Sequence, residues 1–363
     1  MPLKIGIVGA GVMLKYQAEG FLSAGAELTC LAETNPEAAH KAAATYNIPQ
    51  IYGSLEEMLV KAPDNVDAVS VLVPPAFHKE LSIQALLAGK HVLCEKPPAL
   101  NAQEVAEMKR AAEKVGKVLA FDFNNRLRPE SVELARRISN GSFGQINSAQ
   151  AIWIRRSGIP GYGSWFTNRQ VSGGGALIDL LHMVDLALYF MGYPEPICVL
   201  GQTFSDFMED QTRRGAYGQV GDRGISDVES SAHALVTFRT GQILFLRSSW
   251  AEMVKEEQCF VTIQGQKAGG KVLRLFGQEY EGDTTADTCE IYTQEDGKPI
   301  NTKVTVPYDR TMGRVSVAAN FVESVEGKNV QLATPAQALR LMQIVDAVYL
   351  SAKTKTAITS ARS

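Results

Sequence analysis

The stretch "KIGIVGAGVML", residues 4–14, decides the fold of the first third of the chain. An apolar run ends at Val8, glycines follow at Gly9 and Gly11, and apolar residues at helical spacing come next. This order is typical of a buried parallel strand that turns tightly into a helix. Gly9 permits the turn, and Gly11 lets the backbone approach a pyrophosphate at the helix N-terminus. A plain structural turn remains the alternative, because Leu14 replaces the third glycine of the usual motif.

An acidic residue after the next strand favours the dinucleotide interpretation. Glu33 follows "ELTCLA" at about the 20-residue spacing of a carboxylate that binds ribose hydroxyls. A carboxylate repels a 2'-phosphate, and Thr34 follows where an NADP site often has an arginine. We therefore expect NAD, with NADP as the alternative, although a solvated strand end would also explain Glu33. The expected cofactor contacts in this region are Gly9, Gly11, Val12, Met13, Glu33 and Thr34.

Strand and helix patterns alternate up to about residue 122. Near-continuous apolar strands are expected at residues 4–9, 27–32, 67–73, 91–96 and 118–123, and amphipathic helices at 12–25, 36–47, 55–62, 79–89 and 102–116. Such alternation predicts a parallel sheet that helices cover on both faces, as in an α/β Rossmann domain.

After residue 122 the pattern changes to long alternating strands. These are expected at residues 146–154, 229–241, 242–252, 259–265 and 271–277, with the turn signals "RTGQ" and "EDGK" between strand candidates. One helix is expected at residues 176–191 and another at 334–353, where Thr334 and Gln337 form a capping box. The pattern predicts an α+β domain with a large, mostly antiparallel open sheet. The expected domains are residues 1–122, which bind the dinucleotide, and 123–363, which bind substrate and form the oligomer.

The composition excludes several classes of protein. The 363 residues carry a formal net charge of -3 and contain neither a basic stripe nor a run of about 18 apolar residues. We therefore expect no nucleic-acid partner and no membrane span. The 5 cysteines are scattered without a CxxC pair, and the first strand leaves no room for a signal peptide. These features favour a reduced, cytoplasmic protein without a metal site.

The strand at residues 91–96 ends in an unusual way. "HVLCEKPPAL" places Glu95, Lys96 and two prolines at the carboxyl end of a parallel strand, where ligands of such sheets bind. Proline restricts both its own backbone and that of the preceding residue. A lysine held there can hydrogen-bond a substrate hydroxyl, or exchange a proton with it, while a hydride moves to nicotinamide. A surface ion pair at a strand end is the simpler alternative.

At this point the chain resembles the Gfo/Idh/MocA oxidoreductases, the family of glucose-fructose oxidoreductase and inositol dehydrogenase. "HVLCEKP" resembles the EKP motif, and "GIVGAG", "GGGALIDLLHMVDLALYFMG" and "TPAQALRLMQIVDAVYLSAKT" extend the likeness over most of the chain. The resemblance implies NAD(P)-dependent oxidation or reduction of a sugar, polyol or related hydroxyl. It also implies a catalytic role for Lys96 and cofactor contacts at Pro74, Pro75, His78, Glu95 and Lys96.

The resemblance implies a second catalytic cluster at Asp179 and His182. Family members usually carry these residue types four positions apart, whereas here they are three apart. Positions i+3 and i+4 of a helix differ by about 100° in direction, so both side chains cannot occupy the family positions unless the preceding turn adjusts. His182 is expected to act as a general base, because neutral imidazole titrates near physiological pH. A buried helix histidine is the alternative, and the role of Asp179 stays open between orienting His182 and contacting substrate.

The loop at residues 153–170 carries aromatic and arginine side chains that suit a sugar ring. The expected substrate contacts are Asn124, Arg126, Arg155, Tyr162, Trp165, Asp179 and His182. A redox-neutral, NAD-dependent glycosidase and a non-catalytic dinucleotide-binding regulator are the competing interpretations. An exposed apolar sheet face would favour a homodimer or homotetramer through the second domain.

Overall fold

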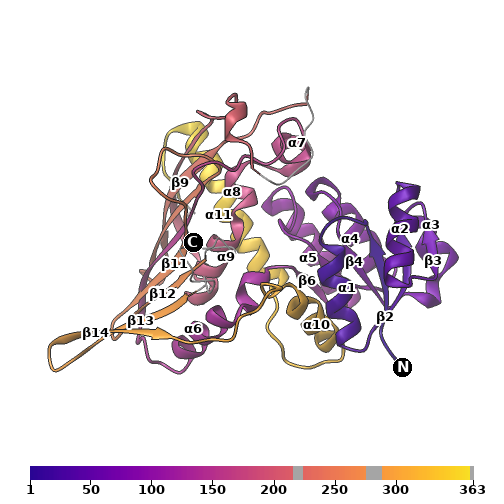
Figure 1. Ribbon diagram of the computed structural model, residues 1–363, viewed down its shortest axis with the longest axis horizontal. Coiled ribbons are helices and arrows are strands. Elements are labelled where there is room, and N and C mark those ends of the chain that lie inside the picture. The colour runs from indigo at the N-terminus through magenta and orange to yellow at the C-terminus, as the bar shows by residue number, and fades with distance from the viewer. Residues whose placement is uncertain (216–223, 275–287, 360–363) are drawn as a thin grey trace. The chain divides into compact units, whose positions relative to one another are not determined.

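The computed structural model describes residues 1–215, 224–274 and 288–359 (Figure 1). The chain divides into two compact units. Unit 1 comprises Met1–Leu127 and Thr311–Leu339, and unit 2 comprises Arg128–Arg310 and Arg340–Ser363. The division expected from the sequence was a single cut at residue 122, whereas the compact units assign a late segment of the chain to unit 1.

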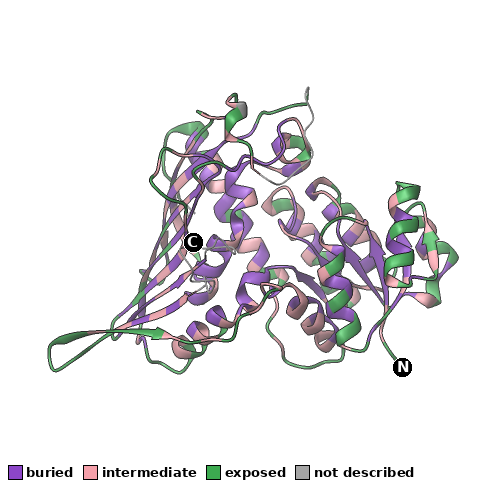
Figure 2. Cartoon of the chain, in the orientation of Figure 1, coloured by how far each residue is buried: buried purple, intermediate pink, exposed green. Residues whose placement is uncertain are grey.

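A six-stranded parallel sheet forms the centre of unit 1. Its strand order is β3-β2-β1-β4-β5-β6, the doubly wound order of a dinucleotide-binding Rossmann domain. The central strands are buried along their length, as Figure 2 shows. The strands are β1 (Lys4–Val8), β2 (Glu27–Ala32), β3 (Gln50–Tyr52), β4 (Ala68–Val71), β5 (His91–Cys94) and β6 (Leu119–Phe121). The predicted Rossmann fold is confirmed, and only the short edge strand β3, which lacks a buried run, was not predicted.

Helices join these strands in the expected order. They are α1 (Leu14–Ser23), α2 (Pro36–Tyr46), α3 (Leu55–Lys61), α4 (His78–Leu87) and α5 (Ala102–Val115), with 3-10 turns η1 (Pro63–Asn65), η2 (Pro75–Phe77) and η3 (Asn124–Leu127). The predicted cap of α5 is present, because the Glu104 N–H donates to Asn101 Oδ1 at 3.0 Å. Asn35 caps α2 in the same way.

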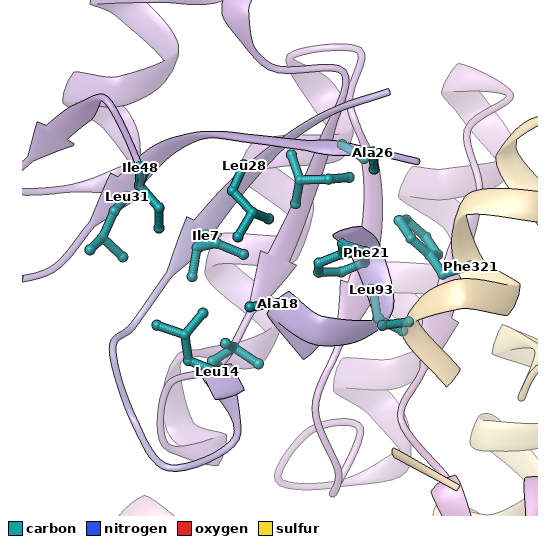
Figure 3. Close-up of a cluster of buried hydrophobic side chains, with 14 of the residues drawn as sticks. Ile7, Leu14, Ala18, Phe21, Ala26, Leu28, Leu31, Ile48, Leu93 and Phe321 are labelled. Carbon is teal, nitrogen blue, oxygen red and sulfur yellow. The ribbon is translucent and has the colours of Figure 1, made fainter. Parts of the chain in front are cut away.

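A late helix, α10 (Arg314–Val325), completes the core of unit 1. The Phe321 ring meets the Phe21 ring of α1 edge to face, with ring centroids 6.3 Å apart (Figure 3). A Cβ on Gly20 would lie 2.4 Å from the Val315 carbonyl oxygen, so the two helices pack at backbone distance. The first 127 residues therefore depend on a segment nearly two hundred residues later for their core.

Unit 2 is built on a nine-stranded sheet in the order β14-β13-β12-β11-β7-β10-β9-β8-β15. Every neighbouring pair is antiparallel except β7 with β10, which confirms the predicted, mostly antiparallel sheet. The strands are β7 (Ile146–Ile154), β8 (Pro196–Phe204), β9 (Ser231–Phe238), β10 (Ile243–Ser249), β11 (Gln258–Gly265), β12 (Gly269–Leu273), β13 (Thr288–Glu295), β14 (Lys298–Val304) and β15 (Ile358–Thr359). Residues 275–277 of the last predicted strand lie outside the described residues.

The helix predicted at residues 176–191 is wrong as a single element. The chain forms α8 (Ala176–Asp179) and α9 (Leu181–Phe190), which are separated at Leu180. Leu180 has φ −91° and ψ 18°, outside the α-helical region, and the helical segments on its two sides bend by 55°. Asp179 and His182 therefore do not lie on one continuous helix, so the angular argument from a regular helix does not apply to them.

The remaining helices are α6 (Pro129–Ser139), α7 (Arg169–Ser172) and α11 (Pro335–Thr354), with 3-10 turns η4 (Trp165–Thr167) and η5 (Gln211–Arg213). The predicted capping box of α11 is present: Gln337 N–H donates to Thr334 Oγ1 and Thr334 N–H to Gln337 Oε1. Within the described residues, no single helix has both the length and the apolar character of a membrane span; only the bent pair 169–179 and 181–190 reaches that threshold when taken together.

Substituting Phe21→Ala should lower the free energy of unfolding by about 3–5 kcal/mol, because it removes a fully buried ring from the contact with α10. Urea unfolding followed by far-UV circular dichroism measures the change. Phe77→Ala is the matched control, since that ring is half exposed. Equal effects of the two substitutions would contradict the assignment of α10 to the core of unit 1.

Candidate active site

The glycine turn after β1 has the geometry that its sequence predicts. Gly9 adopts φ +96°, and a Cβ there would lie 3.0 Å from the Leu72 carbonyl oxygen. At Gly11 a Cβ would meet only that oxygen, at 3.7 Å, and Gly11 and Val12 are exposed. Gly9 is therefore required by the fold, whereas Gly11 leaves an open approach to the backbone.

Glu33 joins this turn to the next helix. Its Oε2 accepts the Ala10 N–H at 2.8 Å, and its Oε1 accepts the Asn35 N–H at 2.8 Å and a longer bond from the Thr34 hydroxyl at 3.3 Å. These bonds hold the carboxylate beside the glycine turn, so Glu33 is an ordered group rather than a solvated strand end. A carboxylate has about four acceptor positions, which leaves capacity for further donors such as hydroxyls.

The residues of this turn fit a dinucleotide. Helix α1 has no side-chain cap at Met13 and no acidic residue in its first turn, so its N-terminal N–H groups face an exposed backbone turn. Such an N-terminus favours an anionic group through both its N–H donors and the helix dipole. A pyrophosphate would fit at this turn, and the remaining acceptor positions of Glu33 would suit ribose hydroxyls.

Lys96 lies at the carboxyl end of β5, between buried neighbours. Glu95 and Pro97 are buried, and the Lys96 side chain is partly exposed. The Lys96 N–H donates to Glu95 Oε2 at 3.1 Å, and the Lys96–Pro97 peptide bond is cis. The lysine is thus held through its backbone at the edge of the sheet where ligands of doubly wound folds bind.

His78 fixes the same segment from the neighbouring loop. It is fully buried, and its ring nitrogens lie 2.7 Å from the Pro97 carbonyl oxygen and 2.8 Å from that of Val73. Burial lowers the pKa of His78, and its contacts with backbone carbonyls oppose that change. Pro74 and Pro75 lie in the loop that His78 ties to the Lys96 segment. The ring of His78 therefore acts on the site by holding backbone.

A buried polar network lies beneath Lys96, and sequence reasoning missed most of it. Gln17 Nε2 donates to Glu95 Oε1 at 3.1 Å and to Asp122 Oδ2 at 3.0 Å, while Gln17 Oε1 accepts from the Ser70 hydroxyl at 2.5 Å. Cys94 pairs with Phe121 in the sheet, so Glu95 and Asp122 leave neighbouring strands side by side. The strand-end rule that identified Lys96 could also have identified Asp122, because Asp122 directly follows β6.

In unit 2, Asp179 at the end of α8 is held by two partners. Its Oδ2 accepts from the Trp250 indole N–H at 2.8 Å and lies 3.5 Å from Arg155 Nη1. Arg155 also donates to the Gly158 carbonyl, and its guanidinium carbon lies 5.1 Å from the centroid of the Trp153 ring. Trp250, which follows β10 and is fully buried, was not predicted, because nothing in its strand pattern distinguishes it from a core tryptophan.

His182 is the second residue of α9, and its ring lies against Trp153, with centroids 6.4 Å apart. Trp153 thus contacts both His182 and Arg155, the partner of Asp179. Arg155 and His182 thus share this indole, and Asp179 joins them through Arg155. Unit 2 therefore holds a carboxylate, an imidazole and an aromatic ring within one set of contacts.

The glycine run before α8 has a role within the protein. A Cβ on Gly175 would lie 2.0 Å from the Glu229 carbonyl oxygen, and one on Gly174 would lie 1.9 Å from the Tyr349 hydroxyl. The buried Glu229 carboxylate accepts the N–H groups of Gly175 and Leu177, at 3.0 and 3.1 Å, and the Tyr349 hydroxyl at 2.9 Å. Burial raises the pKa of Glu229. These contacts fix the start of α8 and hence the position of Asp179.

The predicted substrate residues differ in what they contact. Tyr162 is buried, and its hydroxyl donates to the Asp210 carbonyl oxygen at 2.5 Å. Trp165 is exposed, and its ring stacks on that of Phe166 with centroids 3.7 Å apart. In unit 1, Asn124 donates to the Met312 carbonyl and Arg126 to Gln337 Oε1, at 2.6 and 2.8 Å. Both of these side chains therefore bind the late segment that completes unit 1.

Comparison with known proteins agrees with this description. A family model described as "Oxidoreductase family, NAD-binding Rossmann fold" matches residues 3–123, and one described as "Oxidoreductase family, C-terminal alpha/beta domain" matches residues 135–359. Together the two models cover most of the chain. They agree with the glycine turn and Glu33 on NAD as the cofactor.

Individual relatives extend over the same length. D-glucoside 3-dehydrogenase of Escherichia coli (strain K12) is 34% identical over 98% of this chain and 97% of that protein. Levoglucosan dehydrogenase of Pseudarthrobacter phenanthrenivorans is 28% identical over 66% of each chain. A solved structure of levoglucosan dehydrogenase, in complex with NADH and levoglucosan, has the same fold, with a TM-score of 0.84 at 20% identity over 100% of both chains. The chain therefore belongs to the Gfo/Idh/MocA family and is an NAD-binding oxidoreductase.

Proposed function

We propose that this enzyme oxidises a secondary hydroxyl of a glucoside, or of a closely related sugar, with NAD. The observation that carries the proposal is the 34% identity to a D-glucoside 3-dehydrogenase along nearly the whole of both chains. The likeness to a levoglucosan dehydrogenase, another protein named for a sugar substrate, supports the same class. NAD supplies the hydride acceptor.

Lys96 and His182 are the residues to which we assign the proton chemistry. Lys96 donates a hydrogen bond to the reacting hydroxyl. The bond of its backbone N–H to Glu95, together with the buried neighbours Glu95 and Pro97, fixes the position from which its side chain extends. His182 takes the proton of this hydroxyl while a hydride leaves the carbon that carries the hydroxyl for NAD, so a ketone forms. Asp179 is assigned a positioning role, because Trp250 and Arg155 already occupy one of its oxygens.

We assign the cofactor contacts to two groups of residues in unit 1. The first group is the glycine turn with its acidic partner: Gly9, Gly11, Val12, Met13, Glu33 and Thr34. The second is the pair of strand ends at Pro74, Pro75, His78, Glu95 and Lys96, of which His78 contributes by holding the Pro97 carbonyl. For the sugar, the exposed Trp165 is the better candidate in the loop of unit 2, because the hydroxyl of Tyr162 already binds a backbone carbonyl.

The test is a panel of D-glucosides, anhydrosugars, free sugars and inositols incubated with NAD and then with NADP. We expect NADH to accumulate with a glucoside or anhydrosugar. Cleavage of a glycoside without net NADH would support the redox-neutral glycosidase instead. Absence of turnover with every sugar would support the non-catalytic regulator.

In the same assay, Lys96→Ala should lower kcat by about 10²–10⁴, the usual contribution of a positioned acid–base group. Lys79→Ala is the matched control, because Lys79 lies in the same unit and forms only partly exposed ion pairs with Glu104 and Glu107. Unchanged turnover in Lys96→Ala would remove Lys96 from the mechanism.

The two glycines of the turn should separate folding from cofactor binding. Gly9→Ala should lower the free energy of unfolding by about 1–2 kcal/mol, because the residue has a positive φ. Gly11→Ala should leave stability unchanged but raise the Kd for NAD about tenfold or more, equivalent to about 1.4 kcal/mol. Urea unfolding and fluorescence titration with NADH measure the two quantities. Wild-type affinity in Gly11→Ala would contradict the pyrophosphate assignment.

We also propose that the large sheet of unit 2 forms a homodimer, or a homotetramer, through its open face. Leu200, Leu235 and Phe245 are successive cross-strand partners on β8, β9 and β10, so they form one row on one face. Leu200 is 53% exposed and Phe245 is 47% exposed, while Val199, Val236 and Leu244, which point to the other face, are buried. An apolar row of this kind favours association.

Phe245→Glu should therefore weaken association, because the carboxylate would have to be desolvated within an apolar interface. Light scattering at micromolar concentration should give a dimer or tetramer for the wild type and a smaller species for this variant. Val60→Glu, on an exposed position of α3, should leave the mass unchanged. A monomeric wild type would overturn the proposed assembly.

The five cysteines support a cytoplasmic location, which we also propose. All five thiols are free, and four of them are buried. Free thiols persist in reducing compartments. Recovery of the native protein in a cytosolic fraction checks this location.

A further inference from the structure

Two carboxyl groups, one of which directly precedes Lys96, are buried at the ends of neighbouring strands. Glu95 and Asp122 follow paired residues of β5 and β6, and both accept a hydrogen bond from the same atom, Gln17 Nε2. Both residues are less than one-tenth exposed, and one amide nitrogen lies within hydrogen-bond distance of both carboxyl groups. Two ionised carboxylates placed so close together in a buried site would repel each other, so this geometry favours one proton on the pair.

Gln17 uses both ends of its amide. Its Oε1 accepts from the Ser70 hydroxyl, and its amide nitrogen donates to the two carboxyl groups. Glu95 then has a donor on each oxygen: Gln17 Nε2 on Oε1 and the Lys96 N–H on Oε2. Among the described residues, Asp122 Oδ1 is buried and has no hydrogen-bond donor. A proton shared by the two acids satisfies this oxygen.

The electrostatic surroundings agree with a shared proton. Burial is the main cause that raises the pKa of Glu95 well above its usual range and that of Asp122 to about 6. The positive groups that act on the pair are Lys96 on the same segment and Arg314 at the start of α10, and both oppose the increase for Asp122. Cys94 is the other titratable neighbour, and burial raises its pKa, so its thiol stays neutral. The pair is therefore an anion of single charge near neutral pH.

We propose that Glu95 and Asp122 share one proton and, as a singly charged pair, act as the positioning group of Lys96. The pair holds the Lys96 backbone through Glu95 and supplies one buried countercharge beside the lysine. Loss of the shared proton would leave two negative charges on the pair, one of them unbalanced. Protonation of both acids would remove the negative charge that balances Lys96. The proposal rests on the proposed role of Lys96 in catalysis, whereas the shared proton itself can be measured without substrate.

The two acids offer a matched pair of substitutions. In Asp122→Asn, the amide can donate to Glu95 where the proton was, and its oxygen can still accept from Gln17, so the single charge is kept. In Glu95→Gln, the new amide donor must face one of two existing donors, Gln17 Nε2 or the Lys96 N–H. The proposal therefore predicts opposite outcomes for two changes of equal size. Glu107→Gln, an exposed carboxyl on α5, is the control for loss of a charge.

The proton is measured first, in the protein without substrate. Infrared spectra at neutral pH should show a protonated carboxyl band that is lost in Asp122→Asn and kept in Glu107→Gln. An acid whose pKa is raised by folding stabilises the fold at low pH and loses that contribution as the pH rises through the raised value. The urea midpoint of the wild type should therefore fall relative to that of Asp122→Asn as the pH rises from about 4, where an unfolded carboxyl ionises, through about 6. Absence of the band, or parallel stability curves, would overturn the shared proton.

The positioning role is measured by turnover at neutral pH. Asp122→Asn should keep kcat/KM within roughly threefold of wild type, because one hydrogen bond replaces another. Glu95→Gln should lower kcat roughly ten- to a hundredfold without raising KM for NAD in proportion. Equal losses in the two variants would overturn the positioning role. If the wild type turns over no sugar, the proposed function fails while the infrared and stability results still decide whether the proton is shared.

Discussion

The hydrogen bonds of Gln17 are the constraint on which the carboxyl end of the parallel sheet depends. This one side chain, fully buried on α1, contacts the strand β4 through Ser70 and the ends of β5 and β6 through Glu95 and Asp122. A buried amide that finds all its partners rigidifies its surroundings, whereas a partly satisfied one is costly. The end of the strand that precedes Lys96 is therefore fixed by the polar contacts of Gln17, although the residues of the strand are mostly apolar.

In unit 2, a buried carboxylate orders the backbone next to the candidate site. The Glu229 carboxylate accepts backbone N–H groups at the start of α8, in the way that a side-chain cap would, and the glycines nearby allow it to approach. Arg169 and Tyr349 complete its surroundings. In both units a buried acid orders the backbone next to a residue with a proposed chemical role. Glu229 is some fifty positions from the segment that it orders, whereas Glu95 directly precedes Lys96 and is itself held by the distant Gln17.

Much of the fold followed from local patterns. The alternation of apolar runs and helical segments predicted the Rossmann sheet, and the capping residues Asn101 and Thr334 predicted where two helices begin. The break at Leu180 was not predicted, because helical spacing continues through it and does not record tertiary contacts such as those of α8 with Glu229, some fifty positions later in the sequence. The packing of α10 into unit 1 was missed for the same reason, since helical spacing indicates an apolar face but not its partner.

The candidate site was predictable only where one residue type at one strand end carries the chemistry. Gly9, Glu33 and Lys96 follow from such rules, and each has the surroundings that the rule expects. Asp122 directly follows β6, so the same rule could have identified it, whereas the importance of Trp250 depends on the partner of a single oxygen atom. Asn124 and Arg126 show that donors of a type that suits a sugar also bind the protein's own late segment, which the sequence did not predict.

The assignment of residues 311–339 to unit 1 has a consequence for how the chain is made. The ribosome completes the six strands of the parallel sheet before residue 127, yet Phe21 has no ring partner until α10 emerges. The nascent Rossmann sheet must therefore persist with an uncovered apolar patch throughout the synthesis of most of unit 2. A nascent chain in this state is a natural client for chaperones that bind exposed apolar surface. For the same reason, a fragment that ends at residue 127 would leave Phe21 and its apolar neighbours uncovered.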